Sequence, residues 1–114
     1  MVRLIFGIDI PRSVRIGPGI MIHHFGGVVV NPLVVMGAHC TLRHMVTLGN
    51  LTEGGPVPVL GDRVELGVGC SVLGDVRVGE GARIGAHALV LRDVPAGATV
   101  GGVPASQLTA PGDA

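Results

Sequence analysis

Two adjacent histidines, His23 and His24, stand before Phe25 and two glycines, and a carboxylate, Asp9, precedes His24 by fifteen residues. Histidine has an unperturbed pKa near neutrality, so it can take and release a proton at physiological pH. A carboxylate beside an imidazole fixes the tautomer and stabilises the charged ring that forms when the base takes a proton. These residue types suit general-base chemistry, provided that the fold brings Asp9 beside the histidine pair.

The elements that must position these residues are the units of a six-residue repeat. A helix repeats near 3.6 residues and a strand at 2, so a sustained period of six fits neither. Such a period predicts a solenoid of short strands and turns, in which every rung needs the same inward residues. In the most regular stretch, the first inward place of each rung holds Leu60, Leu66, Val72, Val78, Ile84, Val90 and Ala96.

A second inward place lies four residues after the first, and glycine often follows the first place. Glycine there accepts backbone angles or crowding that a Cβ would resist. The second place holds Val64, Cys70, Val76, Ala82, Ala88, Val94 and Val100. The same frame extends towards the N-terminus through first places at Ile10, Ile16, Ile22, Val30, Met36, Leu42 and Leu48.

The repeat is broken twice. Val30 follows Ile22 at a spacing of eight positions instead of six, and this break holds the histidine pair. Leu60 follows Leu48 at a spacing of twelve positions, and residues 50–58 have no inward pattern, which predicts a loop excursion. Surplus residues leave the body of a solenoid as a bulge or loop, and such departures often carry function. Because three rungs make one turn, Asp9 is expected one turn away from the histidine pair, near the same edge.

The composition agrees with a narrow all-β solenoid and excludes several classes of function. The 114 residues form one domain, with 20 glycines, two phenylalanines and neither tryptophan nor tyrosine to fill a globular core. Eight arginines balance eight acids, so no basic face for nucleic acid or an anionic membrane is predicted. No apolar run approaches a membrane span and the N-terminus is a poor secretion signal, which predicts a cytoplasmic protein. Cys40 and Cys70 hold inward places on different faces, where packing is their expected role.

Several segments resemble a known family, and together they cover about residues 6–106. They are Ile8-Asp9-Ile10, residues 16–24 (IGPGIMIHH), Val46-Thr47-Leu48-Gly49 and Gly102-Val103-Pro104-Ala105. With the repeat, they resemble the hexapeptide-repeat acyltransferases, whose fold is a left-handed parallel β-helix. The likeness is to the serine acetyltransferase branch. It is at least as close to the short acetyltransferases of polysaccharide gene clusters, which share Phe6-Gly7-Ile8, the glycine-rich bulge after the histidines and Cys40-Thr41-Leu42-Arg43.

The resemblance implies an all-β fold, a left-handed parallel β-helix of about five coils. Residues 1–106 would form a single domain and residues 107–114 a flexible tail. It implies a homotrimer in which acetyl-CoA lies in the groove between two subunits and no metal is needed. His24 is then the base, Asp9 its orienting partner and His23 a substrate-binding residue. Backbone groups near Gly49, Gly67 and Gly85 would line the thioester arm, since glycine permits close approach.

The chain departs from the serine acetyltransferase pattern at several positions. His23 replaces an acid that meets the substrate amine, and residues 54–58 (GGPVP) replace an Arg-His pair that meets the substrate carboxylate. Ser106 replaces a basic residue, and Ala114 replaces the isoleucine by which some relatives bind cysteine synthase, so no such complex is expected. A zwitterion needs both of its charges met. The departures therefore favour a sugar or another uncharged hydroxyl as acceptor and leave serine open.

Two other functions stay as alternatives at this point. A γ-type carbonic anhydrase on the same fold would bind zinc through three histidines, and His39 and His44 have the spacing of two of them. They occupy different places in their rungs from those of the family, and a slip of one residue turns a side chain away from a shared metal. The second alternative is a non-catalytic trimeric scaffold, against which the spacing of Asp9 and His24 argues.

Overall fold

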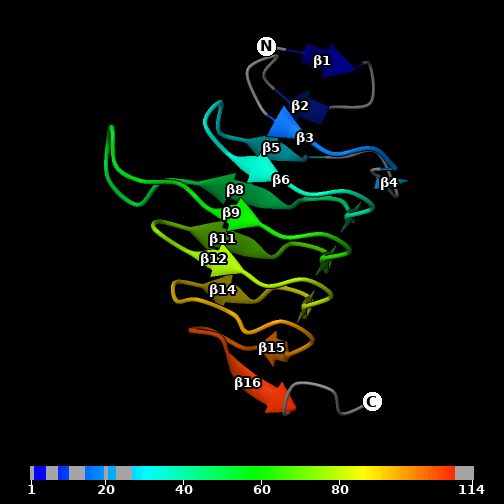
Figure 1. The fold of residues 1–114 in the computed structure, drawn as a ribbon. Helices are drawn as coiled ribbons and strands as arrows, with labels where there is room; N and C mark the ends of the chain where they lie inside the picture. The colour runs from blue at the N-terminus through cyan, green and yellow to red at the C-terminus, as the bar shows by residue number, and fades with distance from the viewer. Residues whose placement is uncertain (1, 5–7, 11–14, 20, 23–26, 110–114) are drawn as a thin grey trace.

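The computed structural model describes residues 2–4, 8–10, 15–19, 21–22 and 27–109, and these residues form sixteen short strands and no helix. The strands lie in three sheets that form the faces of a solenoid (Figure 1). Sheet A contains β1 (Val2–Leu4), β2 (Ile8–Ile10), β5 (Val29–Val30), β8 (Thr47–Gly49), β11 (Ser71–Leu73) and β14 (Leu89–Val90). Sheet B contains β3 (Arg15–Ile16), β6 (Val35–Met36), β9 (Val59–Leu60) and β12 (Arg77–Val78). Sheet C contains β4 (Met21–Ile22), β7 (Thr41–Leu42), β10 (Glu65–Leu66), β13 (Arg83–Ile84), β15 (Thr99–Gly101) and β16 (Ser106–Thr109).

The chain visits sheets A, B and C in turn and thereby traces five coils, as the repeat predicts. Neighbouring coils pair in parallel, with the first inward places in register: Leu42 pairs with Leu66, and Leu66 with Ile84. The solenoid lengthens by one strand layer per coil, from the N-terminal to the C-terminal end in Figure 1. This architecture makes every corner of one coil the neighbour of the equivalent corner in the next.

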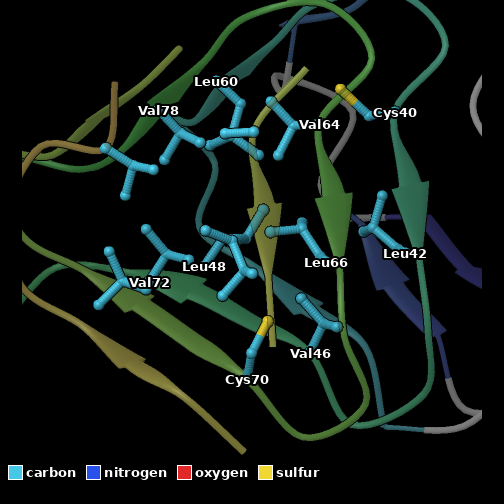
Figure 2. Close-up of a cluster of buried hydrophobic side chains, with 14 of the residues drawn as sticks. Cys40, Leu42, Val46, Leu48, Leu60, Val64, Leu66, Cys70, Val72 and Val78 are labelled. Carbon is cyan, nitrogen blue, oxygen red and sulfur yellow. The ribbon is translucent and has the colours of Figure 1, made fainter. Parts of the chain in front are cut away.

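The core is a column of aliphatic side chains that runs through the centre of the coils. Figure 2 shows side chains from all three faces, including Leu48, Leu66 and Val78, pointing toward one another. No polar or charged side chain is buried among the residues whose burial the structure describes. The predicted inward residues from Val30 to Val94 are buried, with Ala98 and Val100 completing the column at its C-terminal end.

Both cysteines pack in this column, at different corners. Cys40 lies at the corner between sheets B and C, and Cys70 at the corner between sheets C and A. Both are free thiols, and burial raises the pKa of Cys70 to about 12 and also raises the pKa of Cys40. A thiol with a raised pKa stays protonated and unreactive at neutral pH, in keeping with a packing role.

The predicted frame is wrong at Ala96, which is exposed. The first inward place of this rung belongs to Val94, which pairs in parallel with Val78, and the second belongs to the buried Ala98. The first places at Val90 and Val94 are therefore only four positions apart. The Oδ1 atom of Asp93 accepts a hydrogen bond from the Arg77 amide at 2.9 Å. In this shortened rung, a side-chain oxygen therefore takes the place of a backbone carbonyl oxygen as the hydrogen-bond acceptor.

Antiparallel strands close both ends of the solenoid, and the repeat did not predict either of them. β1 pairs with β2, and β16 pairs with β15. The expected flexible tail is wrong for residues 107–109, which belong to β16, whereas residues 110–114 lie outside the described residues. An added strand satisfies backbone groups that the last coil would otherwise leave unpaired.

The expected excursion after β8 is confirmed, and it protrudes from the body of the solenoid in Figure 1. The Gly55 amide closes a turn on the Thr52 carbonyl oxygen at 2.9 Å. Leu51 leans over the next coil, since a Cβ added to Gly74 would lie 2.9 Å from the Leu51 Cδ1 atom. Among the described residues, none belongs to a helix with the length and apolar character needed to cross a membrane.

Candidate active site

The candidate site, which we call the histidine corner, is the corner that joins sheet C to sheet A in the first coil. It begins after Ile22 at the end of β4 and closes at Val29 in β5. Its predicted functional residues, His23 and His24, lie outside the described residues, so their roles stay predictions. Val28 is buried, as is the residue at the second inward place of an ordinary corner. Gly27 has a positive φ of 62°, as does the residue that precedes this place in an ordinary corner. The two surplus residues of this break therefore precede Gly27.

Asp9 belongs to β2, and its backbone lies between two neighbouring strands. It is in antiparallel register with Arg3 and in parallel register with Val29. Asp9 is thus one coil away from the residue at which the histidine corner closes. This backbone register is the one that a pairing of Asp9 with the corner requires.

The equivalent corner of the second coil carries Arg43, His44 and Met45. Ile22 pairs with Leu42, so Arg43 follows Leu42 as His23 follows Ile22. Arg43 is exposed, and the His44 carbonyl oxygen accepts a hydrogen bond from the Gly69 amide at 3.0 Å. A Cβ added to Gly27 would collide with the Met45 Sδ atom, so the two corners are in contact. The six-residue period alone does not align Arg43 with His23, because their spacing is twenty residues and three regular rungs span eighteen.

The three glycines predicted to contact the cofactor do not lie at one place. Gly67 and Gly85 stack in successive coils at the corner between sheets C and A, where their amides donate to Ile84 and Val100 at 2.8 Å each. A Cβ at Gly67 would lie 2.7 Å from backbone atoms of the next coil, so packing alone requires glycine there. Gly49 ends β8 in sheet A, and a Cβ there would meet only a Leu73 methyl group at 3.7 Å.

The histidines His39 and His44 lie at different corners of the second coil. His39 lies at the corner between sheets B and C, exposed and with a positive φ of 59°, and its ring fills the space beside Gly19. His87 packs in the same way beside Gly69. Within the described part of the chain, no group of three or more His, Cys, Asp or Glu side chains could hold a metal ion. The placement of His39 and His44 at separate corners does not favour a shared zinc ion.

A groove of about 350 Å³ lies at the C-terminal end of the solenoid. It is lined by Leu91, Arg92, Pro104, Ala105 and Ser106. The sequence lacks a basic residue at position 106, but the groove has a cation in Arg92. Pro104 and Ala105 therefore lie beside a positive charge that comes from another part of the sequence.

Comparison with known proteins shows which proteins the chain is similar to. Residues 58–92 match the model of the bacterial transferase hexapeptide family (six repeats). The chain is 42% identical over 111 residues to the serine acetyltransferase of Helicobacter pylori strain J99, covering 96% of this chain and 65% of that protein. By these matches, the chain is similar to the hexapeptide-repeat acyltransferases and, among them, to serine acetyltransferases.

Solved hexapeptide-repeat acyltransferases share its fold. Neisseria gonorrhoeae serine acetyltransferase in complex with serine superposes with a TM-score of 0.87 at 42% identity, over 92% of this chain and 43% of that one. The Brucella abortus serine acetyltransferase in complex with coenzyme A gives a TM-score of 0.88 at 34% identity, over 96% and 45%. These likenesses confirm the expected left-handed parallel β-helix. This chain spans about half the length of the curated relatives that it matches.

Proposed function

We propose that this protein is an acetyl-CoA-dependent O-acetyltransferase that acts on the hydroxyl group of a small molecule. The observation that supports the proposal is the backbone register of Asp9 with Val29, the residue at which the histidine corner closes. The chain also carries Asp9, His24, residues 47–49 and residues 102–105 in the order that the resemblance to serine acetyltransferases implies. The proposal includes a cytoplasmic location, because acetyl-CoA is an intracellular thioester.

In the proposed reaction, His24 removes the proton from the acceptor hydroxyl while its oxygen attacks the carbonyl carbon of the thioester. A new C–O bond forms and the C–S bond breaks, and the departing thiolate takes the proton from the imidazolium. Asp9 orients the imidazole and stabilises its positive charge during this exchange. The products are the acetyl ester and free coenzyme A, so the histidine is returned to its neutral form.

We place the acetyl-CoA along the solenoid, with its phosphates towards the C-terminal groove. Arg92 supports this placement, because a guanidinium binds phosphate oxygens through paired donors. The stacked glycines Gly67 and Gly85 lie between this groove and the histidine corner along the sheet C to sheet A edge. Because both residues are glycines, no side chain projects from positions 67 and 85 in the third and fourth coils.

A homotrimer is part of the proposal, since a narrow solenoid offers only shallow grooves for a cofactor. Aliphatic side chains remain exposed on sheet A and its flanking corners in the second and third coils. They are Val29 at 48%, Leu33 at 72%, Met45 at 58% and Leu51 at 59% exposure. A second copy against this face would bury them and deepen the groove beside the histidine corner.

A thiol-release assay tests the activity directly. Purified protein is incubated with acetyl-CoA and, in turn, serine, homoserine and neutral sugars. We expect acceptor-dependent release of coenzyme A and an acetyl ester detectable by mass spectrometry with at least one acceptor. Folded protein that releases no thiol above the rate of spontaneous hydrolysis with any of them would contradict the proposal.

A further inference from the structure

The strand β16 forms the C-terminal edge of sheet C (Figure 1). It is the last strand in the order of that sheet, and β15 is its one neighbouring strand among the described residues. A strand with a neighbour on one side directs about half of its backbone N–H and C=O groups away from the sheet. β16 therefore presents a row of backbone donors and acceptors at the end of the solenoid.

The other two sheets end differently at the C-terminal end. In β14 of sheet A, the Leu89 amide donates to the Gly102 carbonyl oxygen at 3.0 Å, and the Leu89 carbonyl oxygen accepts from the Ala105 amide at 2.8 Å. In sheet B, β12 is followed by a single parallel bridge between Val78 and Val94. In the described part of this end, sheet C is thus the sheet that finishes in a full strand and is suited to pair with a further strand.

This edge lacks the charges by which proteins commonly prevent edge strands from pairing. Residues 94–109 contain no charged residue, and β16 itself reads Ser-Gln-Leu-Thr. By contrast, Arg3 lies in β1, the strand at the other end of the solenoid. A bulge falls at Leu108, since the register with β15 passes from Gln107 to Thr109. The edge is therefore bent at one residue but carries no electrostatic protection.

Aliphatic side chains accompany the unpaired edge. Leu108 is 64% exposed, and Val103, in the turn before β16, is 71% exposed. A Cβ added to Gly101 would lie 3.0 Å from the Leu108 Cδ1 atom, so the Leu108 side chain lies against the last coil. Exposed aliphatic groups beside unpaired backbone groups favour burial against another protein surface.

We propose that two copies of this chain pair end to end through their β16 strands, antiparallel and about a two-fold axis. An antiparallel copy of an edge strand offers the same donors and acceptors in reverse order, so the edge is complementary to itself. Identical surfaces that meet near a two-fold axis place like charges close together, and the lack of charge in residues 94–109 removes this repulsion. In the proposed trimer, three such edges would face the same way, so three short pairings would reinforce one another. The inference goes beyond the proposed function and does not depend on catalysis.

Sedimentation of the chain at several protein concentrations tests the pairing. A lysine on β16 would bring two positive charges close together at the two-fold axis, so Leu108→Lys and Gln107→Lys should each prevent pairing. We expect the wild-type assembly to have twice the mass of either variant. Amide hydrogen exchange in residues 106–108 should also be slower in the wild type, because strand pairing protects backbone N–H groups. Circular dichroism checks that both variants keep the β-sheet signal of the wild type.

Ala96→Lys is the matched control, because it adds the same charge at an exposed position of the last coil outside β16. It should keep the wild-type mass. Equal mass in the wild type and Leu108→Lys, or a halved mass in Ala96→Lys as well, would overturn the inference. A wild-type mass that keeps rising with concentration would also overturn it, because pairing of β16 with β1 of the next copy forms an open chain, whereas two-fold pairing closes at two. Mass is measured without substrates, so each of these outcomes differs from failure of the proposed activity.

Discussion

The corner between β4 and β5 and the corner between β10 and β11 join the same two sheets but are built differently. The second is minimal: Gly67, Val68, Gly69 and Cys70 lead from Leu66 into β11. Its amides are committed to other backbone carbonyl oxygens, from Gly67 to Ile84, from Gly69 to His44 and from Cys70 to Gly67. The first has two more residues between the same sheets and carries the histidine pair. The predicted base therefore lies at the corner where the repeat is longer than packing requires.

The largest expected effect comes from the histidine corner itself. His24→Asn should lower kcat by at least about 10², because a positioned general base contributes about 10²–10⁴ in rate. His23→Asn should reduce kcat much less, and Asp9→Asn should fall between them, since it removes orientation and charge support but leaves the base. Steady-state kinetics measure the series, with acetyl-CoA binding and oligomeric state as controls. An active His24→Asn protein beside an inactive His23→Asn protein would show that the base is the other histidine.

The minimal corner should respond to substitution through stability. In Gly67→Ala, the new Cβ would lie 2.7 Å from backbone atoms of the next coil, which should lower the free energy of unfolding by about 1–3 kcal/mol. Gly49→Ala is the control, because its Cβ has room, and it should change stability by less than about 0.5 kcal/mol. Urea denaturation at fixed protein concentration measures both. If Gly49 also lines the thioester arm, Gly49→Ala should raise the KM for acetyl-CoA while leaving stability unchanged.

The shortened rung near the C-terminal end allows a similar test of packing. Ala98 is fully buried, so Ala98→Leu should overpack the column and cost about 1–3 kcal/mol. Ala96→Leu adds the same atoms at an exposed position and should be nearly neutral. Thermal unfolding of the two variants at equal concentration distinguishes them. The reverse order would mean that the six-residue frame continues unbroken through Ala96.

The smallest effect should be the pH dependence due to Cys70 in the minimal corner. Burial raises the pKa of this thiol in the folded protein to about 12 from an ordinary value of 9.0. Between these pH values the unfolded chain releases the proton and the folded protein keeps it, so stability should fall as pH rises from about 9 to 12. The slope for one proton is at most about 1.4 kcal/mol per pH unit. Cys70→Ala should have a shallower slope in urea denaturation between pH 8.5 and 10.5, and an unchanged slope would contradict this assignment.

Much of the fold could be predicted because each rung repeats the same environment. The inward places from Val30 to Val94 are a local property of the sequence, since every strand of two or three residues must bury one aliphatic side chain. The two breaks were visible as surplus residues after Ile22 and Leu48. The terminal strands β1 and β16 were not visible, because antiparallel pairing at an end follows from unpaired backbone groups of the neighbouring coil and has no six-residue signature.

By itself, the sequence determined that the chain is a solenoid of hexapeptide rungs and that the histidine pair falls where the repeat is interrupted. Only the tertiary structure decided which residues of different coils are neighbours. That depends on the length of each coil, which is twenty residues from Ile22 to Leu42 and sixteen from Val78 to Val94. These lengths set Val94 in place of Ala96 in the core and Arg43 beside the histidine corner. The period of a repeat is encoded within each rung, whereas the register between coils is the sum of every insertion and deletion between them.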